Sequence, residues 1–254
     1  MNIFNYLDES PMGSPYLKYA KNIYSQNGED GIIERLLKEL DINKGTLVEF
    51  GAWDGVYLSN VYNLYKDGIF NAILIESDPD KVAAYHGNFD GVTMHNFFVS
   101  PDRNNENSID NILKKIGYAN IDDDFVLMSI DIDSSDYYIM ESIDIYKPII
   151  IVVETNIAFT PGSNFKSYDR GCSFDSIWEL GKKMGYSVVA YTSNAILVRN
   201  DHVNKLPEFD KKLGIEDIYI DKNQYLTLAR LDENGEITDS FFTESSAYRQ
   251  KINQ

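Results

Sequence analysis

Four oxygen-bearing side chains stand just past the ends of two predicted strands and are the first candidates for chemistry. Asp131 and Asp133 follow one buried apolar run, and Glu154 and Asn156 follow the next. The carboxyl ends of neighbouring parallel strands meet at one edge of a sheet, so we expect these side chains to converge. Alternate residues of an extended chain project to one side, which would align the two aspartates.

Carboxylate and amide oxygens suit Mg²⁺ or Mn²⁺ better than zinc. A divalent cation on Asp131, Glu154 and Asn156 could bind two substrate hydroxyls and lower the pKa of one. Alternatively, Asp131 or Asp133 could act as a general base without a metal. A third reading gives these acids a structural role, as caps of the helix that follows.

A glycine-rich turn follows the predicted strand at 47–50. Gly51 and Gly55 let a bound molecule approach the main chain, because glycine has no side chain to block it. Glu49 and Asp54 flank the turn and could accept hydrogen bonds from an amine or a ribose. The spacing lacks the three glycines of the dinucleotide fingerprint, so an NAD-dependent oxidoreductase ranks last. The alternative is a tight strand-to-helix turn without a ligand, with the helix beginning near residue 58.

Three further residues are expected near the same crevice. Glu76 ends the second strand, 25 residues past Gly51, where an acid can hold ribose hydroxyls. Ser100 follows the third strand, predicted at 92–99. Gln26 lies in a polar segment that precedes an amphipathic helix, and this segment is more polar than a helix cap requires.

Short apolar strands alternate with amphipathic helical segments along most of the chain. This pattern predicts an α/β fold, a Rossmann-like and mostly parallel sheet with helices on both faces. Residues 186–191 and 195–198 predict an antiparallel strand pair that closes the sheet. We expect residues 1–24 to be a lead-in, 25–200 to form the α/β domain, and 201–254 to be a C-terminal extension packed on the same domain.

A long polar and aromatic loop, residues 157–171, follows the fifth predicted strand. Long loops at the carboxyl edge of a sheet commonly carry specificity. We therefore expect Tyr168 and Arg170 to contact the substrate, whereas a connector without function is the alternative.

Charge and composition exclude several classes of partner. The net charge is −17 and no basic stretch stands out, which argues against nucleic acid. No apolar run is long enough to span a bilayer, so no membrane insertion is expected. The single Cys172 excludes an internal disulfide framework and suits the cytoplasm. A homo-oligomer is compatible with these numbers.

The ordered set of motifs resembles FkbM-type methyltransferases, which are class I S-adenosylmethionine-dependent enzymes of bacterial capsule, lipopolysaccharide and natural-product pathways. The resemblance covers roughly residues 22 to 200. Its motifs are Ser25-Gln26-Asn27-Gly28-Glu29-Asp30-Gly31, Val48-Glu49-Phe50-Gly51-Ala52-Trp53-Asp54-Gly55, Ile75-Glu76, Ser129-Ile130-Asp131-Ile132-Asp133 with Asp136-Tyr137, and Val153-Glu154-Thr155-Asn156.

The resemblance implies that Gly51, Asp54 and Glu76 hold S-adenosylmethionine, with Glu49 supporting the turn. Two departures stand out. Ala52-Trp53 replaces the middle of the three-glycine form, and Glu154-Thr155 stands where metal-dependent relatives have an acid-amide pair.

The leading hypothesis is therefore O-methylation of a hydroxyl on a small sugar-type acceptor, nucleotide-linked, in surface polysaccharide biosynthesis. The second is a metal-dependent glycosyltransferase, because Asp131-Ile132-Asp133 is an Asp-x-Asp that could bind a metal and nucleotide-sugar phosphates. The third is a donor-binding protein without catalysis.

Overall fold

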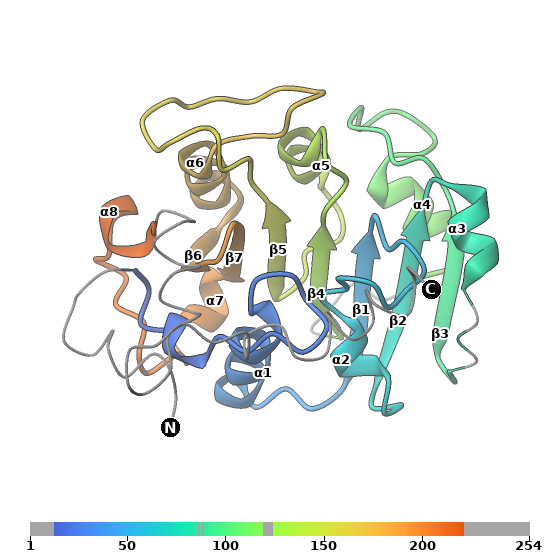
Figure 1. Ribbon diagram of the computed structural model, residues 1–254, viewed down its shortest axis with the longest axis horizontal. Helices are drawn as coiled ribbons and strands as arrows, with labels where there is room; N and C mark the ends of the chain where they lie inside the picture. Colours follow the sequence, from blue (N-terminus) through green and yellow to red (C-terminus); the bar gives the residue numbers. More distant parts are fainter. Residues whose placement is uncertain (1–12, 86, 88, 119–123, 221–254) are drawn as a thin grey trace, which may run out of the picture.

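A seven-stranded sheet in the order β3-β2-β1-β4-β5-β7-β6 forms the centre of the protein (Figure 1). This computed structural model describes residues 13–85, 87, 89–118 and 124–220. Strands β1 to β5 pair in parallel, and β7 runs antiparallel to β5 and β6. The predicted fold class is thereby confirmed. The strands are β1 Gly45–Phe50, β2 Phe70–Glu76, β3 Val92–Asn96, β4 Phe125–Ile130, β5 Ile150–Glu154, β6 Tyr186–Tyr191 and β7 Asn194–Arg199.

Helices flank the sheet and connect its strands. They are the 3-10 helix η2 Leu17–Tyr19 and the α-helices α1 Glu29–Leu40, α2 Tyr62–Tyr65, α3 Pro79–Ala84, α4 Ile109–Lys115, α5 Asp136–Ser142, α6 Phe174–Met184, α7 Asn200–Val203 and α8 Ile215–Ile218. Among the residues that the structure describes, no helix has the length and apolar character needed to cross a membrane.

The central strands form the core and align the site. Every residue of β1 and of β4 is buried, including Glu49 of β1 and Ser129 of β4. The register pairs Phe50 of β1 with Ile130 of β4, and Ile130 with Val153 of β5. The carboxyl ends of these strands therefore lie level. The chain extends outward from β1 on one side and from β4 on the other, and ligands of open α/β sheets bind at such a switch point.

The predicted start of the helix after β1, near residue 58, is wrong, because α2 begins only at Tyr62. Leu58 has a left-handed φ of 55°, which no regular α-helix accepts. The buried carboxylate of Glu49 accepts hydrogen bonds from the Ser59 hydroxyl and the Asn60 N–H, at 2.6 and 2.8 Å. These contacts hold the chain in a loop before the helix starts.

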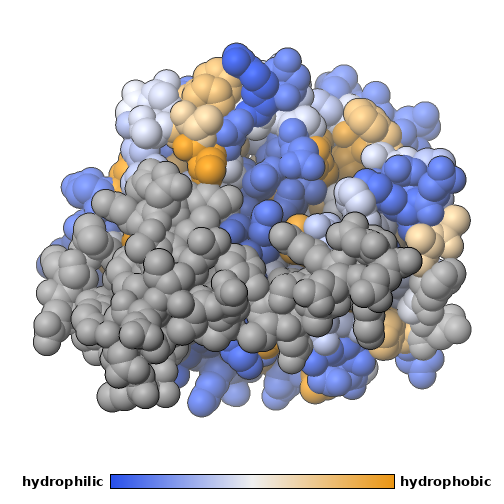
Figure 2. Space-filling view, in the orientation of Figure 1, coloured by the Kyte–Doolittle hydropathy of each residue, from blue (hydrophilic) through white to orange (hydrophobic). Residues whose placement is uncertain are grey.

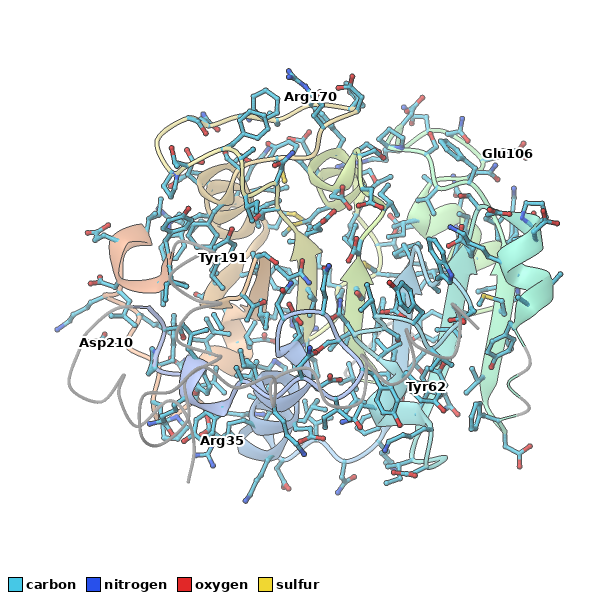
Figure 3. All side chains as sticks on the ribbon, viewed as in Figure 1. Arg35, Tyr62, Glu106, Arg170, Tyr191 and Asp210 are labelled. Carbon is cyan, nitrogen blue, oxygen red and sulfur yellow. The ribbon has the colours of Figure 1, made fainter. Side chains whose placement is uncertain are left out.

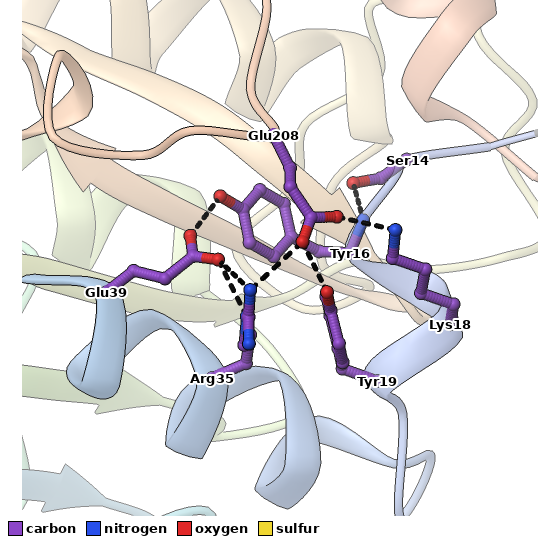
Figure 4. A network of polar contacts seen from close by, with 7 residues as sticks. All are labelled: Ser14, Tyr16, Lys18, Tyr19, Arg35, Glu39 and Glu208. Atoms are coloured by element: carbon purple, nitrogen blue, oxygen red, sulfur yellow. Dashed lines mark hydrogen bonds and ion pairs between the residues drawn. The ribbon is translucent and has the colours of Figure 1, made fainter. Parts of the chain in front are cut away.

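The described part of the N-terminal lead-in is anchored by a polar network (Figure 4). The Tyr16 hydroxyl donates to Glu39 of α1 at 2.6 Å, and Arg35 donates to Glu39 and Glu208. Lys18 pairs with Glu208 at 2.6 Å. The network joins the segment before α1 to the segment before α8. Residues 1–12 and 221–254 lie outside the described part, so the predicted boundaries of the lead-in and the extension stay predictions.

The polar segment ahead of α1 holds the start of this helix against the β6–β7 turn. The Glu29 carboxylate accepts hydrogen bonds from Thr192 and Asn194, and the Asn27 amide donates to the Ser193 hydroxyl at 2.7 Å. Asp30 accepts four hydrogen bonds from residues 23–25. The polarity noted in the sequence therefore serves both the local fold of this segment and its contact with the β6–β7 turn.

Candidate functional site

A cavity of about 210 Å³ opens beyond the carboxyl ends of β1, β2 and β4, and we call it the inner cavity. Its acidic wall is Glu76, Asp131 and Asp133, and its apolar wall comes from the ends of β2 and β3. The residues that line it are Gly51, Trp53, Ile75, Glu76, Ser77, Lys81, Phe97, Phe98, Val99, Asp131, Ile132, Asp133, Ser134 and Ser135. It therefore combines apolar surface with a few convergent oxygens, as ligand sites commonly do.

Glu76 lies in the inner cavity at the end of β2, where the sequence predicts it. Its side chain is 6% exposed. One carboxylate oxygen accepts a hydrogen bond from the Trp53 N–H at 2.9 Å, and the other accepts from the Asp78 N–H at 2.9 Å. The second oxygen also accepts a hydrogen bond from the Ser77 hydroxyl at 3.3 Å. These bonds fix the carboxylate, and the oxygen that faces the Trp53 N–H keeps a lone pair for a ligand hydroxyl.

Gly51 gives the turn after β1 its shape by allowing a close main-chain approach. It has a φ of 70°, and an added Cβ would lie 1.8 Å from the carbonyl oxygen of Asp131. Any side chain here would push the ends of β1 and β4 apart. The glycine is thus required first by packing of the protein on itself, at a point that also borders the inner cavity.

The other residues of this turn act mainly within the chain. Asp54 accepts hydrogen bonds from the N–H groups of Val56 and Tyr57, and it is not among the residues that line the inner cavity. Gly55 has a φ of 81° and its carbonyl accepts from Tyr65. Direct donor contact by these two residues stays a prediction, while their role in shaping the turn is plain.

Glu49 and Ser100 also lie outside the lining of the inner cavity. Glu49 accepts hydrogen bonds from the loop before α2, and burial raises the pKa of its carboxyl to about 7. Its expected support of the glycine-rich turn stays a prediction. The Ser100 hydroxyl accepts a hydrogen bond from the Asp102 N–H at 3.2 Å, within the loop before α4.

A second cavity of about 390 Å³ adjoins the inner cavity, and we call it the polar cavity. Asp133 lines both cavities. The rest of the polar cavity comes from Gln26, from the end of β5, from the loop that follows β5 and from the β6–β7 turn. These further residues are Glu154, Thr155, Asn156, Ile157, Asp169, Arg170, Gly171 and Ser193. Gln26 thus faces this cavity rather than the inner one. In Figure 2, hydrophilic side chains gather above the ends of β4 and β5.

Three carboxylates meet where the two cavities join. Asp131, Asp133 and Glu154 each offer an oxygen, and these atoms lie within 4.8 Å of one another. The acids at the ends of β4 and β5 converge as predicted. The prediction that residues 131–133 are extended is wrong. Asp133 has a left-handed φ of 61°, so a turn brings it beside Asp131.

The electrostatics of this cluster suit a proton acceptor. Burial raises the pKa of Asp131, and the nearby Asp136 and Asp133 raise it further. A hydrogen bond with Glu154 opposes this shift. The raised pKa makes the Asp131 carboxylate a stronger proton acceptor than an exposed aspartate.

Asn156 turns its amide toward the following loop. Its nitrogen donates to the Arg170 carbonyl at 2.9 Å, and its oxygen accepts from the Ala158 N–H at 2.9 Å. Asp133 is therefore better placed than Asn156 to complete a set of oxygen ligands with Asp131 and Glu154.

The two expected substrate contacts lie on the same loop but face different hollows. Figure 3 shows Arg170 at the outer end of this loop, and Arg170 lines the polar cavity. Its guanidinium carbon lies 5.1 Å from the ring centre of Phe165. Tyr168 instead stacks on Tyr138 of α5, with ring centres 3.9 Å apart, and lines a groove along that helix.

Asp136 is a site residue whose role was not predicted. It is buried and accepts hydrogen bonds from the N–H groups of Ile132 and Ser134, so it holds the turn that carries Asp133. Burial raises its pKa to about 6. An aspartate at the first turn of a helix, six residues past the end of a strand, was the available signal.

Comparison with known proteins adds similarities of fold. No protein-family model matches the sequence, and no curated protein matches it. Several similar solved structures are described as S-adenosylmethionine-dependent methyltransferases.

An amino pentose methyltransferase from Micromonospora echinaspora is 8% identical over 67% of this chain and 89% of its own, with a TM-score of 0.41. The CurJ carbon methyltransferase is 10% identical over 69% of this chain, with a TM-score of 0.44. An O-methyltransferase family protein from Burkholderia thailandensis is 12% identical over 66%, with a TM-score of 0.42. The matched region covers 55% of the CurJ carbon methyltransferase and 55% of the Burkholderia protein. Similarity at this level assigns no activity to the chain.

Proposed function

We propose that this protein is an S-adenosylmethionine-dependent methyltransferase that acts on a hydroxyl group. The observation that carries the proposal is the inner cavity, where a fixed carboxylate at the end of β2 faces two acids beyond β4. The sequence motifs that resemble FkbM-type enzymes supply these residues. S-adenosylmethionine, when bound, supplies a methyl group on a cationic sulfur.

The inner cavity fits the chemistry of this donor. The carboxylate of Glu76 can accept a hydrogen bond from a ribose hydroxyl, and Ile75, Phe97 and Val99 offer apolar surface for a purine. Asp131 and Asp133 provide negative charge for a cation. Gly51 borders the cavity with main chain alone.

Asp131 is the proposed general base. Its raised pKa makes it a stronger base than an ordinary carboxylate, and the Glu154 carboxylate lies beside it. The residues at the junction of the cavities would orient the acceptor hydroxyl and take its proton as the methyl group transfers. Positioning of two bound reactants can supply much of the rate.

The polar cavity is the proposed acceptor site. Its lining offers carboxylates, amides, hydroxyls and one guanidinium, which suits a molecule with many hydroxyl groups. We propose a small sugar-type acceptor, nucleotide-linked, and membership of the FkbM-like family of surface polysaccharide enzymes. Arg170 would contact it, as the loop position predicts.

A divalent cation is a second possibility for the three carboxylates. Asp131, Asp133 and Glu154 lie close enough together to share one ion such as Mg²⁺ or Mn²⁺. The same cluster keeps a metal-dependent glycosyltransferase as the alternative function. Titration with nucleotide sugars and Mn²⁺ separates this alternative from methyl transfer.

Two variants divide the roles of the site. Glu76→Gln should weaken binding of S-adenosylhomocysteine about 10- to 100-fold, because a hydrogen bond to a charged group contributes about 1.5–3 kcal/mol. Asp131→Asn should leave that binding nearly intact and abolish turnover. Asp110→Asn is the matched control, since Asp110 is also buried and accepts hydrogen bonds from main-chain N–H groups, away from both cavities. Equal loss of binding in all three variants would contradict the assignment.

A further inference from the structure

A groove of about 470 Å³ runs beside α5 and α6, apart from the inner and polar cavities. We call it the α5 groove. It is lined by Pro101, Arg103, Tyr138, Glu141, Ser142, Ile143, Asp144, Lys147, Tyr168, Leu180, Lys183 and Met184. The loop after β5 links this groove to the polar cavity, because Tyr168 lines the first and Asp169 lines the second.

Tyr168 forms an exposed aromatic platform in the α5 groove. Its ring lies at 7° to that of Tyr138, with centres 3.9 Å apart, yet its side chain is 62% exposed. One face is thus covered by a tyrosine while much of the ring meets solvent. Rings held this way present a flat apolar surface at small cost in side-chain entropy.

The platform has a fixed position because its loop is pinned on both sides of Tyr168. The Ser167 N–H donates to the Gly171 carbonyl at 2.9 Å, and the Gly171 N–H donates to the Ser134 carbonyl at 2.8 Å. Lys166 also donates to the Tyr137 hydroxyl at 3.3 Å. An exposed ring on a loop tied this closely to α5 is preorganised for a ligand.

Three cationic side chains, Arg103, Lys147 and Lys183, also line the groove. Arg103 donates to the main-chain carbonyl of Glu141 at 3.0 Å, which fixes its guanidinium and leaves other N–H groups unused by that bond. Lys183 lies 3.8 Å from the Glu141 carboxylate. Lys147 has no recorded side-chain partner within the described residues and also lines the groove.

The α5 groove differs in charge from the inner and polar cavities. The chain has 23 basic and 40 acidic residues, and acids outnumber bases in the inner and polar cavities. Three bases face two acids, Glu141 and Asp144, in the α5 groove. Among these three hollows, it is the one suited to an anion.

We propose that the α5 groove binds a phosphorylated sugar, with the sugar ring on Tyr168 and the phosphate among Arg103, Lys147 and Lys183. Sugars expose a face of C–H groups that packs on aromatic rings, and phosphate pairs with guanidinium and ammonium groups. Tyr168 and Asp169 are neighbours on the loop that borders both hollows, so the groove would hold a phosphorylated sugar of the acceptor while the polar cavity holds the part with the reacting hydroxyl. This inference rests on the proposed function for its biological meaning, but the groove can be tested by itself.

The test is a titration of the full chain with α-D-glucose 1-phosphate in a low-salt buffer without phosphate. Binding is measured by saturation-transfer NMR. Glucose and inorganic phosphate are titrated separately. Saturable binding of the sugar phosphate that is tighter than binding of either part supports the proposal. Equal affinity for inorganic phosphate would overturn the role of the tyrosine platform, and no saturable binding would overturn the site.

Matched variants locate the binding. Tyr168→Ala should weaken it about three- to tenfold, since an aromatic contact of this kind contributes about 0.5–1.5 kcal/mol, whereas Tyr168→Phe should retain it. Lys183→Gln should weaken binding severalfold. Lys182→Gln is its control, because Lys182 is the preceding residue of α6 and lines a different hollow. Equal affinity in the Lys182 and Lys183 variants would refute the assignment.

S-adenosylhomocysteine binding separates this proposal from the proposed function. Both Tyr168 variants should bind it like the wild type, because Tyr168 is not part of the inner cavity. If the sugar phosphate binds and S-adenosylhomocysteine does not, the proposed sugar-phosphate site is supported and the proposed methyl transfer is refuted. The reverse result refutes the groove alone.

Discussion

Gly51→Ala should destabilise the protein far more than its backbone conformation alone explains. Gly51 has a φ of 70°, and a left-handed alanine costs about 1–2 kcal/mol. The added Cβ would lie 1.8 Å from the Asp131 carbonyl oxygen and 2.9 Å from its carbonyl carbon. Both atoms are main chain at the end of β4, so the contact is relieved only when β1 and β4 separate.

Gly68 provides a control with nearly the same backbone. Its φ is 72°, and nothing lies within 4 Å of the position of an added Cβ. Gly68→Ala should therefore cost only the conformational term, about 1–2 kcal/mol. Overpacking in a tight site costs about 1–3 kcal/mol more, so we expect about 2–5 kcal/mol for Gly51→Ala.

The assay is equilibrium unfolding in urea, with the free energy of unfolding compared among wild type, Gly51→Ala and Gly68→Ala. Binding of S-adenosylhomocysteine is measured on each folded variant, and it should fall only for Gly51→Ala, because that residue borders the inner cavity. Equal loss of stability in the two variants would refute the packing argument. Unchanged binding by Gly51→Ala would refute the link between the turn and the cavity.

Three further predictions follow from charges in the described chain. The pKa of Glu49 is raised by burial, so between about pH 5 and about pH 7 the native state keeps a proton that the unfolded state loses. The free energy of unfolding should therefore fall by about 1 kcal/mol for each pH unit in this range. Glu49→Gln should flatten that slope in urea titrations at several pH values; an unchanged slope would exclude Glu49 as its source. Asp131 has a raised pKa, so methyl transfer should decline as pH drops toward neutrality rather than only near pH 4, and a pH–rate profile that is flat down to about pH 5 would argue against it as base. Glu29→Ala should lower stability by about 1–3 kcal/mol, since the hydroxyl of Thr192 and the amide of Asn194 lose a buried acceptor, and equal thermal midpoints for variant and wild type would contradict this.

The sequence carried most of the fold because its strands are short, apolar and bounded by polar residues. The predicted strand at 186–191 coincides with β6, and the buried apolar run that precedes Asp131 is β4. Acids beyond β4 and β5 converge because adjacent parallel strands end level, and that rule needs no structure. Glu76 lies in the inner cavity for the same reason.

Details that depend on a single backbone angle could not be predicted from the sequence. Leu58 and Asp133 both have a left-handed φ, which side chains other than glycine seldom adopt, so neither the delayed start of α2 nor the turn at Asp133 was predictable. The long-range partners of Asn27 and Glu29 lie over 160 residues away, in the β6–β7 turn. Sequence reasoning saw their polarity but had no means to find these partners.

The measurement that most directly tests the account is calorimetric titration of the purified chain with S-adenosylhomocysteine, with and without a chelator. The account predicts saturable binding at one site, micromolar or tighter, that Glu76→Gln weakens and Asp110→Asn does not. Absence of binding with and without the chelator would contradict the methyltransferase proposal, and would direct the next titration to nucleotide sugars with Mn²⁺.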